Sequence, residues 1–237
     1  KGQQPDWGFG NLSYFVYKRT YSRLMENGKQ EEFFDTVKRN VEGVFSIQLN
    51  HCKKMHLPWN AHKAQISAQK MFQKMWEFKF LPPGRGLWTM GTPVVDKIGS
   101  AALNNCGFVS TDNLSKDFSG PFAWACDMLM LGVGIGYDTK GAGKVTIKKP
   151  TGPKHTYKIP DTREGWVESI RLLIESYKLL NQGEDNHKIE FDYSDIRPAG
   201  QPIKGFGGTA SGPQPLIEGH DNLRKLLNSY SGKELDS

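Results

Sequence analysis

Two neighbouring stretches decide the fold class of this chain: Asp161-Thr-Arg-Glu-Gly-Trp-Val-Glu-Ser-Ile-Arg-Leu-Leu-Ile-Glu-Ser-Tyr177 and Ile189-Glu-Phe-Asp-Tyr193. The first begins with Asp161-Thr-Arg-Glu164, which has the form of a capping box with Asp161 as the capping residue. Its apolar residues then recur at helical spacing: Trp166, Val167, Ile170, Leu173, Ile174 and Tyr177. In the second stretch apolar and acidic residues alternate, which predicts a strand. A helix that leads into a strand favours an α/β domain with parallel strand pairing.

The same alternation extends outward from these stretches. Three more elements are predicted: a strand at 107–111, a helix at 121–131 and a helix at 215–230. Two glycine-rich segments separate them. Residues 140–157 are predicted to form a hairpin or loop excursion with a short strand at 145–147, and residues 197–212 are predicted to be irregular.

The amino-terminal part has a different pattern. Apolar residues at helical spacing predict helices over 31–45 and 64–78, with the Met and aromatic positions packed in a core. At Leu81-Pro-Pro-Gly84 the composition changes and glycine becomes frequent. We therefore expect a helical amino-terminal region at 1–80 and an α/β region at 81–237.

Composition excludes several classes of protein. The 237 residues carry 31 Lys and Arg against 25 Asp and Glu, and aromatic residues make up 11%, too many for a disordered chain. No apolar run approaches the roughly 20 residues of a membrane helix, and no signal peptide is visible. Three cysteines form neither a disulfide framework nor a zinc site by themselves. We expect an intracellular, cytoplasmic protein that binds no membrane, and a chain that is a fragment of a longer one.

A basic surface, as the net charge of +6 implies, could bind nucleotides, nucleic acid or an acidic partner. The basic residues occur only in pairs, such as Lys148-Lys149, without a run interleaved with aromatics. Most of them are therefore interpreted as solvated surface, and no nucleic acid is expected as a partner. The six histidines form no HxxxH or HExxH pair, so no metal site is expected.

The segment Gly205-Phe-Gly-Gly-Thr-Ala210 fits the loose G-x-G-x-x-G/A pattern of dinucleotide-binding turns. No strand runs directly into it, and the Gly-Lys-Ser/Thr of a P-loop is missing. Two interpretations stay open: a flexible loop whose N–H groups and Lys204 face a nucleotide, and a turn that needs positive φ angles.

Cys106 lies between Asn105 and Gly107 at the start of a predicted strand. A lone cysteine is most often a small buried core residue, and Cys52 and Cys126 fit that interpretation. The neighbouring Asn and Gly residues suggest a tight, partly open site at Cys106, although spacing alone does not establish reactivity.

Several blocks, taken in order, carry a resemblance to a known family: Tyr17-Lys-Arg-Thr-Tyr-Ser-Arg23, Gly84-Arg-Gly-Leu-Trp-Thr-Met-Gly-Thr92, Leu103-Asn-Asn-Cys-Gly-Phe-Val109, Pro160-Asp-Thr-Arg-Glu-Gly-Trp-Val167, Asp195-Ile-Arg-Pro198 and Gly205-Phe-Gly-Gly-Thr-Ala-Ser-Gly-Pro213. The chain resembles the amino-terminal part of adenosylcobalamin-dependent (class II) ribonucleotide reductases of the monomeric ribonucleoside-triphosphate type. The last two blocks are the most distinctive.

The resemblance implies a helical region at 1–80 and, at 81–237, the first part of a ten-stranded α/β barrel that includes the effector-site region. It implies radical reduction of a ribonucleoside triphosphate to the deoxyribonucleotide for DNA synthesis. The cofactor would be adenosylcobalamin, bound mostly by residues outside this chain. The implied partners are a deoxynucleotide effector and thioredoxin or a similar dithiol reductant.

Carried over by position, Cys106 matches the first cysteine of the redox-active pair. The expected effector-binding residues are Ser119, Asp127, Met130, Lys140, Gln201 and Lys204. Among them Asp127 is the strongest candidate for contact with the effector's sugar, and Gln201 and Lys204 lie on the loop that passes between effector and substrate. The expected substrate-binding residues are Arg85, Gly86, Asn105, Gly134 and Gly136.

The chain departs from the family pattern in two respects. The excursion between Tyr137 and Pro160 is shorter, and the thiyl cysteine, the second cysteine of the pair and the carboxy-terminal shuttle cysteines have no match. This chain alone is therefore predicted to be inactive. The alternatives are the large subunit of a metal-dependent ribonucleotide reductase and a non-catalytic nucleotide- or nucleic-acid-binding module.

Overall fold

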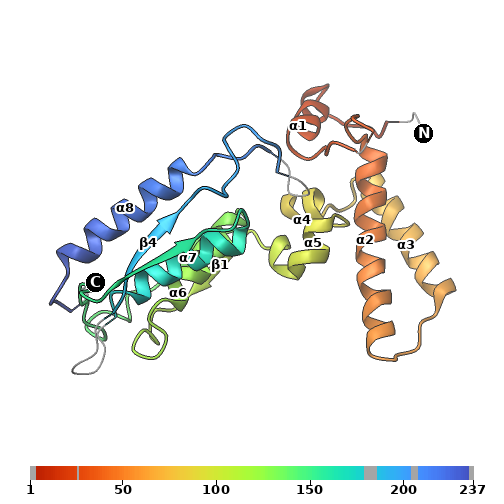
Figure 1. Ribbon diagram of the computed structural model, residues 1–237. Helices are drawn as coiled ribbons and strands as arrows, with labels where there is room; N and C mark the ends of the chain where they lie inside the picture. Colours follow the sequence, from red (N-terminus) through yellow and green to blue (C-terminus); the bar gives the residue numbers. More distant parts are fainter. Residues whose placement is uncertain (1–3, 26, 179–185, 204–207, 235–237) are drawn as a thin grey trace. The chain divides into compact units, whose positions relative to one another are not determined.

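The computed structural model describes residues 4–25, 27–178, 186–203 and 208–234 (Figure 1). The chain forms two compact units, Lys1–Asn104 and Asn105–Ser237. Residues 81–104, which follow the change in composition, group with the first unit by their contacts.

The first unit is helical. Its described elements are α1 (Leu12–Thr20), α2 (Phe33–Lys54), α3 (Ala61–Trp76), α4 (Gly84–Thr89), α5 (Pro93–Ile98) and the 3₁₀ helix η1 (Gly99–Leu103). The predicted helices at 31–45 and 64–78 are confirmed as α2 and α3, and α2 continues to Lys54. The Glu32 and Asp35 side chains accept each other's backbone N–H groups and so fix the start of α2.

The core of the first unit confirms the predicted packing of the aromatic and Met positions. Phe33, Val37 and Val41 from α2 meet Met75 from α3, Tyr17 from α1 and Leu87 from α4. A polar cluster lies beside this core: Arg39 pairs with the buried Glu31 at 2.7 Å and also donates to the Leu87 carbonyl at 3.1 Å. These contacts attach α4 to α2.

The second unit contains two parallel strand pairs, each connected through a helix. Its elements are β1 (Cys106–Val109), α6 (Gly120–Met130), β2 (Gly134–Tyr137), β3 (Lys154–Lys158), α7 (Arg163–Glu175), β4 (Lys188–Asp192) and α8 (Gln214–Ser229). β1 pairs with β2 and β3 with β4. The expected α/β class with parallel pairing is therefore confirmed, as are the helices α6, α7 and α8 and the strands β1 and β4.

Two local predictions are corrected. Residues 145–147 form isolated bridges, Thr146 to Glu234 and Ile147 to Lys178, and no strand. The strand of that region is β3, which a distant partner, β4, stabilises. Thr162, and not Asp161, caps α7: its backbone is extended and its side chain accepts from the Gly165 N–H at 3.0 Å.

A buried core joins α7, α8 and the segments beside them in the second unit. Its described members are Phe118, Ile147, Leu173, Ile174, Tyr177 and Leu227, with a second group of Ile159, Ile196 and Leu216. The predicted apolar face of α7 lies in this core. Across the described part of the chain, no helix is both long enough and apolar enough to cross a membrane.

Candidate functional site

Cys106 begins β1 directly beside β2. It lies opposite Gly134 in the strand register, and the Gly134 N–H donates to the Asn105 carbonyl at 2.9 Å. The structure therefore brings three predicted residues, Asn105, Cys106 and Gly134, to one end of the strand pair. Gly136 follows two positions along β2, opposite Phe108.

The direction of the Cys106 side chain follows from its neighbour. A Cβ atom at Gly107 would lie 3.0 Å from the Trp124 ring of α6, so the Gly107 side of β1 faces that helix. Successive strand residues point to opposite faces, and Cys106 therefore faces away from α6. Cys106 is exposed, as is Phe108 on the same face.

The other two cysteines have different surroundings. Cys126 is half-buried on α6, and burial raises the pKa of its thiol. Cys52 is half-buried on α2 in the first unit. All three are free thiols, and among them Cys106 has the open position that a redox thiol requires.

The effector candidates on α6 are attached to α7 at both ends of the helix pair. Ser119 is buried, and its hydroxyl donates to Glu175 at 2.6 Å. At the other end the Asp127 carboxylate pairs with the guanidinium of Arg163. Met130 is half-buried in the last turn of α6. Asp127 is thus the α6 candidate with both a charge and partial exposure.

The remaining effector candidates lie on loops. Lys140 is exposed, and its ammonium lies 3.9 Å from Asp138. Gln201 is exposed, and its carbonyl accepts from the Ala210 N–H at 2.7 Å. Lys204 lies outside the described residues. The Asp138 carboxylate accepts from Ser110 and from the backbone and hydroxyl of Thr111, which holds its pKa well below the usual range.

Two substrate candidates belong to the first unit. Gly86 is buried in α4, where an added Cβ would lie 3.2 Å from Pro82. Arg85 is half-buried beside it, and its carbonyl accepts from the Thr89 hydroxyl at 2.7 Å.

Sequence reasoning missed four polar partners near the candidate site: Arg163, Glu175, Asp138 and Arg197. In the sequence, Arg163 belongs only to the predicted capping box at 161–164. Only the packing of α6 against α7 shows that its partner is Asp127, 36 residues earlier. The available signal was the charged residue at the start of an amphipathic helix.

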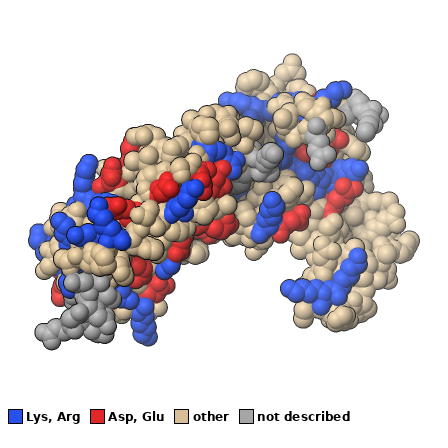
Figure 2. Space-filling view, viewed as in Figure 1, with Lys and Arg blue, Asp and Glu red and all other residues tan. Residues whose placement is uncertain are grey.

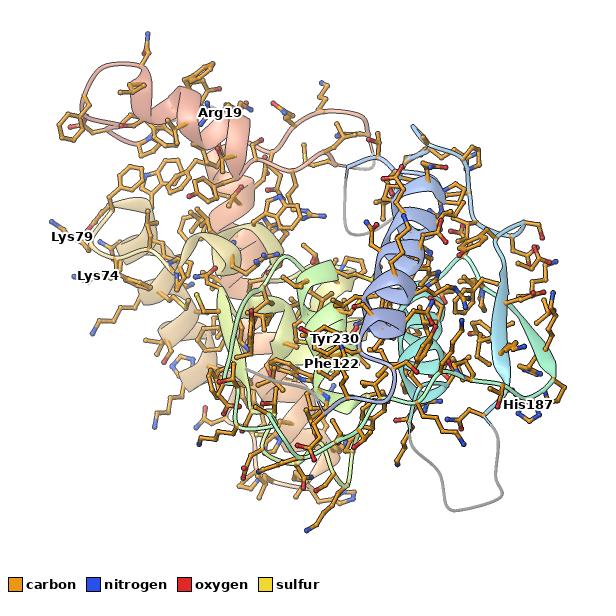
Figure 3. The ribbon with its side chains drawn as sticks, turned by 90° about the vertical axis from the view of Figure 1, so that its left-hand side faces the viewer. Arg19, Lys74, Lys79, Phe122, His187 and Tyr230 are labelled. Atoms are coloured by element: carbon orange, nitrogen blue, oxygen red, sulfur yellow. The ribbon has the colours of Figure 1, made fainter. Side chains whose placement is uncertain are left out.

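Charge divides unequally between the two units. Residues 1–104 hold 15 Lys and Arg against 8 Asp and Glu, whereas residues 105–237 hold 16 against 17. Figure 2 shows blue and red side chains interspersed over the second unit. Lys74 and Lys79 project outward from the first unit in Figure 3. The whole basic excess of the chain thus belongs to the helical unit.

Comparison with known proteins identifies the architecture. Residues 1–92 match the family model of the ribonucleotide reductase alpha domain. Residues 139–227 match that of the B12-dependent ribonucleotide reductase insertion domain. A solved structure described as a B12-dependent (class II) ribonucleotide reductase superposes with a TM-score of 0.84 at 30% identity, over 98% of this chain and 39% of that one.

Curated proteins that match the chain carry names of the same family. The chain is 48% identical over 237 residues to the adenosylcobalamin-dependent ribonucleoside-triphosphate reductase of Euglena gracilis, covering 98% of this chain and 32% of that protein. It is 45% identical to a probable enzyme of the same name from Dictyostelium discoideum, covering 99% and 33%. It is 31% identical to that of Lactobacillus leichmannii, covering 98% and 38%.

These matches define the class of protein as a ribonucleotide reductase. Within that class, the chain belongs to the adenosylcobalamin-dependent (class II) family, as the sequence blocks indicated. It spans about a third of the length of the relatives it matches.

Proposed function

We propose that this chain is part of an adenosylcobalamin-dependent ribonucleoside-triphosphate reductase, and that it contributes one thiol of the redox-active pair and part of the effector site. The observation that carries the proposal is the exposed Cys106 at the start of β1, beside Asn105 and Gly134. Residues 1–80 would be the helical amino-terminal region, and residues 81–237 the first part of the barrel.

In the proposed reaction the ribose 2′-OH leaves as water and a hydrogen takes its place. Cys106 and a second cysteine, outside this chain, supply the two electrons and become a disulfide. A dithiol such as thioredoxin then reduces that disulfide by thiol exchange. Cys126 cannot be the second thiol, because it lies on α6 while Cys106 faces away from that helix. The chain alone is therefore expected to be inactive.

Adenosylcobalamin, when bound, would supply the radical that starts the reaction. An apolar cavity of about 610 Å³ in the first unit does not fit this group. Side chains such as Trp7, Tyr17 and Phe33 line it, and Asp6 is its one charged lining residue. A corrin with many amide groups needs more polar partners, so we assign no residue of this chain to the cofactor.

The proposed effector is a deoxynucleotide. Asp127 would accept a hydrogen bond from its sugar hydroxyl, because a half-exposed carboxylate is an acceptor of charge-assisted hydrogen bonds. Ser119 is already bonded to Glu175, so its proposed role is to hold the start of α6 in position. Lys140, Gln201 and Lys204 would contribute from the loops.

The test is an activity assay of the complete enzyme with ribonucleoside triphosphates and a dithiol. We expect deoxynucleotide formation that requires adenosylcobalamin and needs no second subunit. Activity that required a metal-bearing subunit instead would favour the large-subunit alternative. Salt-sensitive binding to single-stranded DNA, with no nucleotide reduction, would favour a binding module.

A further inference from the structure

The helix pair formed by α2 and α3 carries charge of one sign. Residues 43–79 contain six lysines, no arginine and one acidic residue, Glu77. This stretch therefore holds most of the basic excess of the first unit. On the face that Figure 2 shows, the side chains at the end of the pair where α2 leads into α3 include blue ones and no red ones.

Three of these lysines share one face of α3. Lys63, Lys70 and Lys74 are exposed, and their spacings of seven and four residues correspond to about two helical turns and one. Lys79 follows the helix. Its N–H donates to the Lys74 carbonyl at 2.9 Å, and the two side chains project outward on the same side in Figure 3. We call Lys63, Lys70, Lys74 and Lys79 the lysine stripe.

The lysine stripe has no acidic partner within the part of the chain that the structure describes. None of its four ammonium groups forms an ion pair there, whereas Lys38 on α2 reaches Glu42 at 3.8 Å. The Glu77 carboxylate accepts a hydrogen bond from Gln73 at 2.9 Å. The stripe can therefore bind an anionic partner without first breaking an ion pair.

The length of the stripe indicates what kind of anion fits it. At 1.5 Å per residue, Lys63 and Lys74 lie about 16 Å apart along the axis of α3. The phosphates of one nucleotide form a single short chain, which cannot contact both ends of the stripe. A DNA duplex presents about ten phosphates over the same length. A polymer with repeated phosphates can therefore contact all the lysines at once.

The residue types of the stripe argue against a protein or a membrane as the partner. Protein interfaces are enriched in Arg and aromatic residues and depleted in Lys, and the stripe contains Lys alone. A helix on a membrane surface needs an exposed apolar face beside its basic face. On α3 the apolar side chains Ala68, Met71 and Phe72 pack against the core of the first unit instead. Lys, as a flexible point charge, suits phosphate oxygens in many orientations.

We propose that the lysine stripe binds the phosphate backbone of a nucleic acid without reading its sequence. Lysines that neutralise phosphates release condensed counterions, so the binding weakens steeply as the salt concentration rises. The sequence by itself predicts no such partner, because these lysines are dispersed along the chain and only the helix aligns them. The stripe shares no residue with the proposed thiol pair or effector site, and the inference goes beyond the proposed function.

The test measures the binding of fluorescent, mixed-sequence oligonucleotides to the complete enzyme by anisotropy, with single strands and the matching duplexes as separate probes. Four lysine–phosphate contacts predict that the affinity falls about 50- to 150-fold between about 50 and 200 mM salt. The triple variant Lys63→Gln, Lys70→Gln and Lys74→Gln should lower the slope of log K against log salt by about 2–3. Stripe-dependent binding of either probe supports the proposal, and the tighter one identifies the form of nucleic acid.

Glutamine forms helix about as well as lysine, so the variant should keep α3 intact. The three single variants serve where the triple variant fails to fold, and each should lower the slope by about 0.7–0.9. The matched control removes the same charge from exposed lysines elsewhere, in Lys97→Gln, Lys188→Gln and Lys225→Gln. It should leave the slope unchanged.

Four results would overturn the proposal. The first is no binding at low salt, and the second is an equal loss in both triple variants, which would show a general effect of net charge. The third is stripe-dependent binding of polyglutamate as tight as that of the oligonucleotides, which would indicate an acidic protein. The fourth is stripe-dependent binding to phosphatidylserine vesicles without binding to oligonucleotides, which would indicate a membrane surface.

Discussion

The two thiols of the second unit, Cys106 and Cys126, differ in their exposure to solvent. Cys106 is exposed on the strand face opposite α6, whereas Cys126 is half-buried and burial raises its pKa. The thiolate is the reactive form, so both effects favour Cys106. We predict that iodoacetamide at pH 8 labels Cys106 at least about tenfold faster than Cys126, as measured by peptide mass spectrometry.

The control for that experiment is Cys106→Ser, which should remove the fast phase and leave the rate at Cys126 unchanged. Equal labelling rates of the two cysteines in the unmodified chain would contradict the open position of Cys106.

His220 is the buried histidine of the second unit, with both ring nitrogens bonded. The Ser169 hydroxyl donates to the Trp166 carbonyl at 2.7 Å, so it accepts from His220 Nε2–H at 3.0 Å. His220 Nδ1 then accepts from the Tyr193 hydroxyl at 2.8 Å. The ring is therefore neutral in the fold. Burial, with a smaller contribution from Arg224 and opposition from Asp221, lowers its pKa to about 4.

This pKa has a defined consequence for stability. Between pH 6.5 and 4 the unfolded chain binds a proton at His220 that the folded chain does not bind. The stabilisation is complete above pH 6.5 and falls as the pH drops towards 4. We predict that lowering the pH from 7 to 4.5 reduces the free energy of unfolding of the unmodified chain by about 2 kcal/mol more than that of His220→Gln. Urea unfolding at each pH measures this difference. Parallel pH profiles for the two proteins would exclude this role.

At the scale of elements, the start of α7 depends on a glycine. Alanine normally stabilises a helix relative to glycine by about 1 kcal/mol. At Gly165, however, a Cβ atom would lie 2.6 Å from the Pro160 carbonyl. We predict that Gly165→Ala destabilises the chain by about 1–3 kcal/mol in urea unfolding.

Gly219 on α8 is the matched control, because outside its own stretch of helix no atom of the described residues lies within 4 Å of a Cβ built there. Gly219→Ala should stabilise by about 0.5–1 kcal/mol. Destabilisation of similar size at both positions would show that the close approach of Pro160 is not the cause.

Whether an element could be predicted from the sequence depends on how far apart in the chain its stabilising contacts lie. Helices α2, α3, α6, α7 and α8 were predicted because their apolar periodicity lies within one segment. β2 and β3 were not predicted, because both are short: Gly134-Ile-Gly-Tyr137 has glycine at every second position, and Lys154-His-Thr-Tyr-Lys158 is mostly polar. Their partners, β1 and β4, lie 28 and 34 residues away in the register.

The candidate site could likewise be predicted only in part. The resemblance placed Cys106, Asn105 and Gly134, which the strand register brings together. It gave no partner for Asp127, because the pairing with Arg163 arises only when α6 packs on α7. Side-chain partners across such an interface depend on tertiary geometry that local sequence does not encode.

At the scale of the whole molecule, apolar exposure supports the proposed place of the chain in a larger barrel. Phe108 and Tyr137 are 63% and 71% exposed on a pair of strands. An isolated two-stranded sheet is marginal in water, and closing a barrel removes its edges. Further strands beside β1 and β2 would pair with their open edges, and a closed barrel would enclose the side chains on the inner face. The chain spans about a third of the length of its relatives, which accords with this arrangement.

The most direct test of the proposed function replaces Cys106 in the complete enzyme and measures deoxynucleotide formed with adenosylcobalamin and excess dithiol. Without Cys106 the pair cannot form its disulfide, and the two electrons are not supplied. We predict that Cys106→Ser abolishes multiple turnover while Cys126→Ser retains it. Full multiple turnover in Cys106→Ser would contradict the role assigned to this cysteine.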